Sequence, residues 1–157
     1  MIVVLMGVSG VGKTTIGERL AQRLGWPLIE GDDYHPAANV AKMGAGIPLD
    51  DDDRWPWLDA LNRRIRGEGN AVVTCSALKE SYRQRLLAGV ADARLVYLHA
   101  PKAVIAARVA ARKHRYMPAS LLESQFATLE PPTDAIAVAV SGEPEACVVA
   151  IIAALGR

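Results

Sequence analysis

Residues 7–14 read Gly7-Val8-Ser9-Gly10-Val11-Gly12-Lys13-Thr14 and match the pattern G-x-x-x-x-G-K-[ST] in full. An apolar, β-branched run at residues 2–6 precedes them, and residues 13–24 follow with apolar side chains at helical spacing. The order of strand, glycine-rich turn and helix is the context that this motif requires. Glycines let several backbone N–H groups converge on one point, and the start of a helix adds partial positive charge there. The stretch therefore predicts a phosphate-binding loop at residues 7–14.

This phosphate-binding loop is predicted to hold ATP and Mg²⁺. Lys13 would bridge the β- and γ-phosphates, and the Thr14 hydroxyl would coordinate the metal. The chain contains neither the Asn-Lys-x-Asp nor the Asp-x-x-Gly element of guanine-specific switches, and no acid ends the predicted third strand. This combination is typical of small-molecule and nucleotide kinases, in which an acceptor site faces the phosphates. The residues assigned to phosphate binding are Gly7, Ser9, Gly10, Val11, Gly12, Lys13, Thr14 and Thr15.

Strand-like and helix-like segments alternate along the whole chain, which predicts right-handed crossovers and a parallel sheet covered on both faces. The predicted strands are residues 2–6, 28–30, 71–75, 95–98 and 136–140. The predicted helices are residues 13–24, 57–66, 80–87, 103–113, 121–129 and 143–155, and the long stretch 31–53 is polar. We therefore expect residues 1–157 to form one α/β domain, a three-layer sandwich of the P-loop NTPase type with a five-stranded parallel sheet.

The composition is that of a globular protein from a reducing compartment. Of the 157 residues, 51% are apolar and 22% are charged. Lysine and arginine total 18 against 17 acidic residues, and this near balance argues against a nucleic-acid or membrane-surface protein. The longest apolar run, residues 146–155, is far shorter than the roughly 20 residues that span a bilayer, and residues 1–6 lack the features of a signal peptide. Two cysteines are too few for a disulfide framework, so we expect a cytoplasmic protein.

Two acids and a histidine directly follow the predicted second strand. Loops at the carboxyl ends of parallel strands face the ligand crevice, so Asp32 is expected to face the terminal phosphate. A carboxylate there can accept the proton of an attacking hydroxyl; the alternative is a cap or turn residue, which is the interpretation favoured for Asp33. His35 precedes Pro36, which holds it extended, and is interpreted as a polar site residue or a surface histidine.

Charged residues farther along the chain suggest an anionic ligand. Residues 50–53 are four consecutive aspartates, a run typical of a solvated helix start. Arg54 follows this run and can bind a carboxylate through two parallel N–H hydrogen bonds. Lys79 and Arg83 are four residues apart and would share one helix face, either at an anion site or as an exposed basic face.

A second basic pair, Arg108 and Arg112, has the same helical spacing. Like charges at this spacing repel unless an anion offsets them, and ATP would be such an anion; the alternative is a solvated basic face. Cations on a lid, placed at about residues 112–121, would reach the transferring phosphoryl group only after closure, which also excludes water.

Several longer motifs resemble the gluconokinase family. They are Gly31-Asp32-x-x-His35-Pro36-x-x-Asn39-x-x-Lys42-Met43, Pro48-Leu49-x-Asp51-x-Asp53-Arg54-x-Pro56-Trp57-Leu58, Cys75-Ser76-Ala77-Leu78-Lys79-x-x-Tyr82-Arg83 and Ser124-Gln125-Phe126-x-Thr128-Leu129-Glu130-x-Pro132. Together with the phosphate-binding loop they extend over nearly the whole chain, and the first two are far more specific than that loop. The resemblance implies a fold similar to shikimate and adenylate kinases, with a lid. It also implies transfer of the γ-phosphoryl group of ATP to the 6-hydroxyl of D-gluconate, with Mg²⁺ as cofactor and a homodimeric assembly.

The resemblance further implies roles for individual residues. Asp32 would be the base, and Lys13 and Arg112 would complete the catalytic set. Arg108 would stack on adenine, Arg112 would reach the phosphates, and Pro144 would belong to an adenine-contacting loop or only start a helix. The residues implied for gluconate binding are Asp32, His35, Lys42, Arg54, Lys79, Arg83 and Gln125. A small polyhydroxy anion needs cations for its carboxylate and polar partners for its hydroxyls, which these residues supply.

The chain departs from the family pattern at two places. Residues 114–118 read His-Arg-Tyr-Met-Pro where the family commonly has Gly-His-Phe before Met-Pro, so neither His114 nor Arg115 is assigned a catalytic role. The second predicted strand ends in Glu30 rather than Asp, which keeps a carboxylate of longer reach near Mg²⁺. Two alternatives stay open: a kinase of another small hydroxy acid, such as shikimate or a related aldonate, and a nucleotide-binding regulator without turnover.

Overall fold

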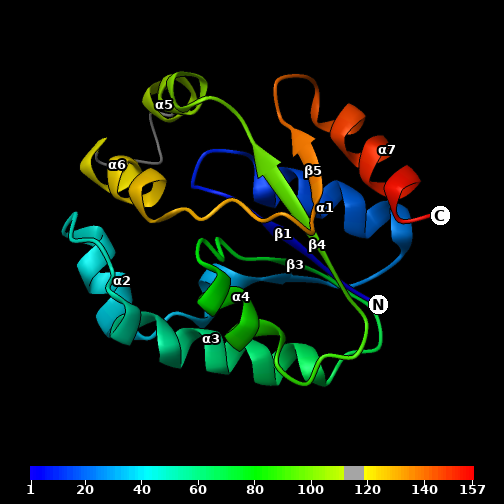
Figure 1. Ribbon diagram of the computed structural model, residues 1–157, viewed down its shortest axis with the longest axis horizontal. Helices are drawn as coiled ribbons and strands as arrows, with labels where there is room; N and C mark the ends of the chain where they lie inside the picture. Colours follow the sequence, from blue (N-terminus) through cyan, green and yellow to red (C-terminus); the bar gives the residue numbers. More distant parts are fainter. Residues whose placement is uncertain (112–118) are drawn as a thin grey trace.

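A parallel sheet of five strands forms the centre of the molecule, in the order β2-β3-β1-β4-β5. The computed structural model describes residues 1–111 and 119–157. The strands are β1 (Ile2–Met6), β2 (Leu28–Glu30), β3 (Ala71–Thr74), β4 (Ala93–His99) and β5 (Ile136–Ala139). All neighbouring strands pair in parallel, and β1 lies between β3 and β4. The predicted α/β class with a five-stranded parallel sheet is therefore confirmed (Figure 1).

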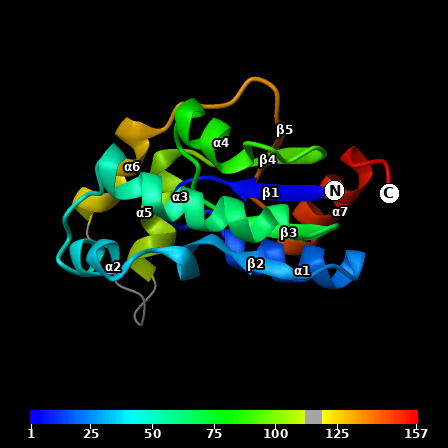
Figure 2. The same cartoon turned by 90° about the horizontal axis from the view of Figure 1, so that it is seen from below.

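Helices cover both faces of this sheet (Figures 1 and 2). The helices on one face are α1 (Lys13–Leu24) and α7 (Pro144–Ala154), and those on the other are α3 (Asp51–Arg66) and α4 (Glu80–Leu87). Beyond the carboxyl ends of the strands lie α2 (Ala37–Gly44), α5 (Lys102–Ala111) and α6 (Ala119–Thr128). In Figure 1, α2 stands on one side of this end of the molecule, and α5 and α6 stand on the other.

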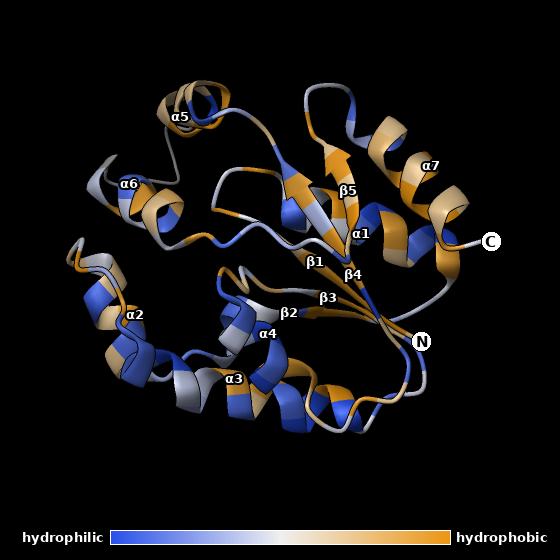
Figure 3. Ribbon diagram, in the orientation of Figure 1, coloured by the Kyte–Doolittle hydropathy of each residue, from blue (hydrophilic) through white to orange (hydrophobic). Residues whose placement is uncertain are grey.

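The hydrophobic core lies along the sheet. Every residue of β1 is buried and apolar, because helices cover both faces of this central strand. Figure 3 shows apolar strands between helices that carry polar residues. From α3, Trp57, Leu58 and Leu61 point into the core. In the part of the chain that the structure describes, no helix is both long enough and apolar enough to cross a bilayer.

The polar stretch 31–53 contains two elements that the sequence analysis did not predict. A 3-10 turn, η1 (Gly31–Tyr34), follows β2 directly, and α2 comes after it. Both elements are short, so the sequence carries little helical periodicity at these positions. They place Asp32 and His35 next to the carboxyl ends of the strands.

Helix α3 also starts earlier than predicted, at Asp51 instead of Trp57. Asp50 and Asp53 form a capping box: Asp53 N donates to Asp50 Oδ1 at 2.8 Å, and Asp50 N donates to Asp53 Oδ2 at 3.0 Å. This cap helps the helix run through Pro56, which lies inside it and donates no backbone hydrogen bond. The interpretation of the acidic run as a helix start is confirmed.

Candidate active site

The phosphate-binding loop connects β1 to α1 and wraps around the side chain of Lys13. Its glycines adopt backbone angles that other residues rarely adopt, with φ of 92° at Gly10 and 97° at Gly12. A Cβ on Gly10 would also lie 2.8 Å from Val109 Cγ2, so α5 packs directly on this loop. Lys13 Nζ donates to the carbonyl oxygens of Gly7 at 2.7 Å and Val8 at 3.1 Å. Burial lowers the pKa of Lys13, and the negative charge of Asp32 opposes that shift.

A cavity of about 620 Å³ opens in front of this loop. It is bounded by segments that follow β1, β2 and β3, and by side chains from α3, α5 and α6. The predicted site residues that line it are Ser9, Gly10, Gly12, Lys13, Thr14, Thr15, Asp32, His35, Arg54 and Gln125. Gly7 and Val11, also assigned to phosphate binding, are buried within the loop. The fold therefore places the predicted phosphate site and much of the predicted acceptor site in the same cavity.

Asp32 lies on η1, and close packing behind it fixes the backbone there. A Cβ on Gly31 would lie 2.2 Å from the carbonyl oxygen of Thr74, so only glycine lets β2 approach β3 this closely. Trp57 Nε1 donates to the Gly31 carbonyl oxygen at 2.8 Å. The Asp32 side chain is 85% exposed and lines the cavity, where its carboxylate is free to meet a ligand.

His35 lies beside Asp32 in an extended conformation (φ −66°, ψ 133°), as its position before Pro36 predicts. Its ring stacks on Trp57 with centroids 4.1 Å apart, and its side chain is only 4% exposed. Nε2 lies 3.8 Å from Asp32 Oδ1, and Nδ1 lies 3.1 Å from Asn39 Nδ2. Burial lowers the pKa of His35, which favours the neutral ring.

Arg54 reaches the cavity from the first turn of α3, and a tyrosine supports it. Its Nη1 donates to the Tyr82 hydroxyl at 2.9 Å, and its Cζ lies 5.1 Å from the centre of the Tyr82 ring. The Tyr82 hydroxyl in turn donates to Asp51. Hydrogen bonds from Tyr82 and Lys79 hold the pKa of Asp51 below its usual value. The sequence analysis gave no role to Tyr82 and took Asp51 only as a helix-start residue, because neither residue's partner is a sequence neighbour.

Two lysines of the predicted gluconate set do not line the cavity, because acidic partners hold them elsewhere. Lys42 Nζ pairs with Asp53 Oδ2 at 2.7 Å, next to the cap of α3. Lys79 Nζ pairs with Asp51 Oδ1 at 3.2 Å and lies over the ring of Tyr82. Lys79 is the N-cap residue of α4. The structure therefore does not place either lysine at the predicted gluconate site.

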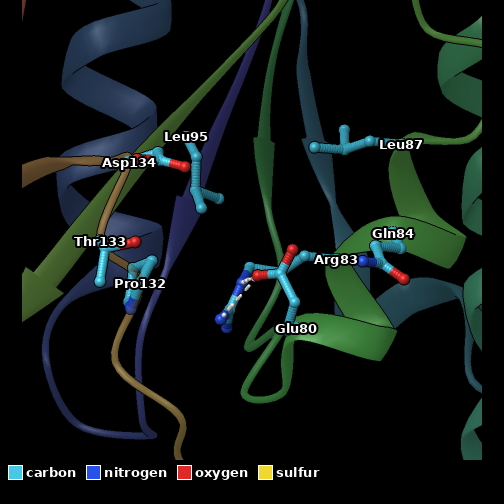
Figure 4. Close-up of a pocket in the computed structure, with 8 residues that line it drawn as sticks. All are labelled: Glu80, Arg83, Gln84, Leu87, Leu95, Pro132, Thr133 and Asp134. Atoms are coloured by element: carbon cyan, nitrogen blue, oxygen red, sulfur yellow. Dashed lines mark hydrogen bonds and ion pairs between the residues drawn. The ribbon is translucent and has the colours of Figure 1, made fainter.

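Arg83 is also placed outside the main cavity. Its buried guanidinium donates to the carbonyl oxygens of Ala77 at 2.8 Å and Glu130 at 2.9 Å, and it pairs with Glu80. Figure 4 shows Arg83 and Glu80 in a separate, open cavity of about 370 Å³, with Pro132 and Thr133 across from them. These contacts tie α4 to the segment after α6. Arg83 is therefore engaged in holding the structure around the site.

A carboxylate lies beside the hydroxyl that is predicted to hold the metal. Thr14 Oγ1 donates to Glu30 Oε2 at 3.2 Å, and Thr74 Oγ1 donates to the same oxygen at 2.7 Å. Magnesium prefers oxygen ligands, retains several waters, and uses one or two carboxylates together with substrate phosphates. A threonine hydroxyl and a glutamate at the edge of the phosphate-binding loop fit that chemistry.

Of the remaining predicted residues, Gln125 lines the cavity, while Arg108 and Pro144 do not. Gln125 on α6 contacts the phosphate-binding loop: Ser9 N donates to Gln125 Oε1 at 2.7 Å, and Gln125 Nε2 donates to Ser9 Oγ at 3.0 Å. Arg108 on α5 donates to the carbonyl oxygen of Val140, just after β5. Pro144 begins α7, as the simpler of its two interpretations predicts. Arg112 lies outside the described residues, as do residues 112–118 of the predicted lid.

Comparison with known proteins identifies close relatives of this chain. A family model described as an AAA domain matches residues 2–132. A gluconokinase of Gluconobacter oxydans is 49% identical over 145 residues, which cover 89% of this chain and 82% of that protein. The crystal structure of a gluconokinase from Sinorhizobium meliloti superposes with a TM-score of 0.91 at 45% identity, and the match covers 99% of this chain and 91% of the other. A shikimate kinase from Bacteroides thetaiotaomicron shares the fold, with a TM-score of 0.73 at 18% identity over 100% of this chain and 99% of its own.

Proposed function

The chain belongs to the gluconokinase family, and on that premise we propose that it transfers the γ-phosphoryl group of ATP to the 6-hydroxyl of D-gluconate. One observation carries the proposal: Lys13 of the phosphate-binding loop, the carboxylate of Asp32 and the guanidinium of Arg54 all line one cavity. These three groups serve a phosphate, a hydroxyl and a carboxylate respectively. A protein that only binds a nucleotide needs the first of them alone.

Asp32 acts on the acceptor hydroxyl in this proposal. As the substrate oxygen forms its bond to the γ-phosphorus, the O–H bond breaks and the proton moves to the Asp32 carboxylate. The bond between the γ-phosphorus and the bridging oxygen breaks at the same time, and ADP leaves. The carboxylate is exposed in the cavity of the ligand-free protein, so a hydroxyl can reach it without displacing a protein partner there.

The phosphate-binding loop and its lysine serve the leaving side of the reaction. Lys13 gives up its contacts with backbone oxygens to bind the phosphates, and its charge stabilises the transferring group. Thr14 and Glu30 would hold Mg²⁺, which neutralises charge on the phosphates when it is bound. We assign Arg108 to the adenine end, because its guanidinium joins α5 to Val140 in the loop between β5 and α7. The role of Arg112 at the phosphates remains a prediction from the sequence.

Arg54 is the group that recognises the carboxylate of gluconate. The guanidinium carries five N–H donors in a planar arrangement. Among residues 1–111 and 119–157, its one hydrogen bond is from Nη1 to the Tyr82 hydroxyl. The other donors are available to a carboxylate in the cavity. Lys42 and Lys79 are not assigned to the carboxylate, because each is paired with an aspartate and neither lines the cavity.

A coupled assay of ADP formation tests the proposal directly. The purified protein is given ATP and Mg²⁺ with D-gluconate, its epimers or shikimate, and the phosphorylated product is identified by NMR. We expect the highest kcat/KM with D-gluconate, phosphorylation at the 6-hydroxyl, and loss of turnover in EDTA that added Mg²⁺ restores. A clear preference for shikimate would support the alternative kinase, and ATP binding without transfer to any of these acids would overturn the proposal.

A further inference from the structure

We propose that Asn39 is a positioning residue for His35. It holds the ring as the neutral tautomer that carries its proton on Nε2, and this N–H donates to an oxygen of the substrate next to Asp32. The identity of that oxygen, a hydroxyl of a polyhydroxy acid, rests on the function proposed above. The tautomer is a property of the ligand-free protein and is tested separately.

The side chain of Asn39 lies between a backbone carbonyl oxygen and a ring nitrogen of His35. Asn39 is only 3% exposed and sits in the first turn of α2. Its Nδ2 lies 2.8 Å from the backbone carbonyl oxygen of Asp53 and 3.1 Å from His35 Nδ1. Both distances are within hydrogen-bond range, so the single amide nitrogen joins α2, α3 and the residue after η1.

The backbone carbonyl decides which way the amide faces. A carbonyl oxygen only accepts hydrogen bonds, so the NH₂ group of Asn39, and not its oxygen, must face Asp53. The second hydrogen of that NH₂ group then points to His35 Nδ1, which must accept it. A histidine whose Nδ1 accepts is neutral and carries its proton on Nε2.

The proton on Nε2 faces the cavity at the place where Asp32 stands. The distance of 3.8 Å between Nε2 and Asp32 Oδ1 is longer than a direct hydrogen bond. An oxygen that lies about 2.8 Å from each atom satisfies both, because it can accept from Nε2–H while its own proton goes to the carboxylate. The stack on Trp57 holds the ring plane in this direction.

The charges around His35 agree with a neutral donor. Burial lowers the pKa of His35, the positive charge of Arg54 adds to that shift, and Asp32 opposes it. A neutral ring with its proton on Nε2 cannot take up a second proton at the atom that faces the substrate. Of this pair, Asp32 is therefore the proton acceptor and His35 is the donor that orients the hydroxyl.

Nitrogen-15 NMR of the ligand-free protein reads the tautomer. The chain has three histidines, and the variants His99→Gln and His114→Gln assign the two other signals. At neutral pH we expect Nδ1 of His35 in the unprotonated range and Nε2 in the protonated range. A proton on Nδ1, or rapid averaging between the two tautomers, would overturn the proposal.

Two matched variants test whether Asn39 causes this state. In Asn39→Ala, the His35 signals should shift toward an average of tautomers, and kcat/KM for gluconate should fall about tenfold while KM for ATP stays within twofold. Asn62 is the control, because it is also buried and donates to two backbone carbonyls, Leu86 O at 2.7 Å and Ala88 O at 2.9 Å. Asn62→Ala should lower the melting temperature without moving the His35 signals.

The outcomes separate this proposal from the proposed function. If Asn39→Ala leaves the His35 signals unchanged, or if both alanine variants affect gluconate turnover equally, Asn39 has only a structural role. If Asn39→Ala does not fold, the spectrum of the unsubstituted protein still decides the tautomer. If that protein shows the expected tautomer and yet does not phosphorylate gluconate, the function fails and the tautomer assignment stands.

Discussion

Gln125 and Ser9 are joined by two hydrogen bonds, although 116 positions separate them in the sequence. The side-chain amide of Gln125 accepts from the Ser9 backbone N–H and donates to the Ser9 hydroxyl. Helix α6, whose first residues belong to the predicted lid at about residues 112–121, is thus fastened to the loop that is predicted to hold the phosphates. In the ligand-free protein, the backbone N–H of Ser9 therefore already donates a hydrogen bond to Gln125.

This contact predicts that Gln125→Ala loosens α6 in the ligand-free protein. Each hydrogen bond is worth roughly 1 kcal/mol, and the substitution removes both. Local opening of α6 should therefore become at least about tenfold more frequent. Hydrogen exchange of the α6 backbone amides measures the effect. Ser124→Ala is the control, because Ser124 also lines the cavity from α6 but is not part of the contact with Ser9. Equal exchange in all three proteins would show that the contact does not hold the helix.

Asp32→Asn is expected to lower kcat by about 100-fold or more, because an amide cannot accept the proton of the attacking hydroxyl. The KM for ATP should stay close to that of the unsubstituted protein, since the phosphate-binding loop is untouched. Steady-state kinetics with gluconate and ATP measure both constants. Asp33→Asn serves as the control, because it changes an exposed neighbouring carboxylate that does not line the cavity. A kcat within a few-fold of the original would leave Asp32 with a positioning role only.

Arg54→Ala is expected to raise the KM for gluconate by roughly 10- to 100-fold, since a hydrogen bond to a charged group is worth about 1.5–3 kcal/mol. The KM for ATP should change little. Tyr82→Phe removes the hydroxyl that accepts from Arg54 and keeps the aromatic ring next to the guanidinium. It should therefore also raise the KM for gluconate, but by less than Arg54→Ala does.

The control for these two variants is Arg85→Ala on α4, where the guanidinium pairs with Asp59 and does not line the cavity. It should leave both KM values unchanged. An equal rise in the KM for gluconate and for ATP in Arg54→Ala would indicate a loss of folded structure instead of a lost ligand contact.

The contacts of Asp53 with Lys42 and with the capping box make stability depend on pH in the acid range. The hydrogen bond from Lys42, together with that from the Asp50 backbone, holds the pKa of Asp53 below its usual value of 3.8. Because the folded state binds this proton less readily than the unfolded state, the stabilisation is complete well above pH 3.8. It is lost as the pH falls toward the folded-state pKa.

Asp53→Asn should therefore flatten the fall of the melting temperature between about pH 5 and pH 3. Thermal unfolding followed by circular dichroism across this range gives the profile. Asp52→Asn changes an exposed carboxylate of the same run and should keep the original slope. Identical profiles for Asp53→Asn and the unsubstituted protein would mean that other carboxylates govern the acid response.

Much of the fold follows from patterns that are local in the chain. The phosphate-binding loop, the five strands and most helices could be predicted, because periodicity and turn residues act between sequence neighbours. The same holds for His35, which is extended because Pro36 follows it. Helix α2 was missed, since a short helix carries little periodic signal. For α3, the acidic run was correctly taken as a helix start, but the helix itself was predicted only from Trp57, because Pro56 lies just before that residue.

The site divides in the same way. The residue types of the sequence determined that this chain would offer a phosphate-binding loop, an acid after the second strand and several cations for an anionic ligand. Only the tertiary structure decided which cations reach the cavity: Arg54 does, while Lys42, Lys79 and Arg83 are held by Asp53, Asp51 and backbone carbonyls. The position of a charged side chain depends on the partners that folding brings near it, and those partners come from distant parts of the chain.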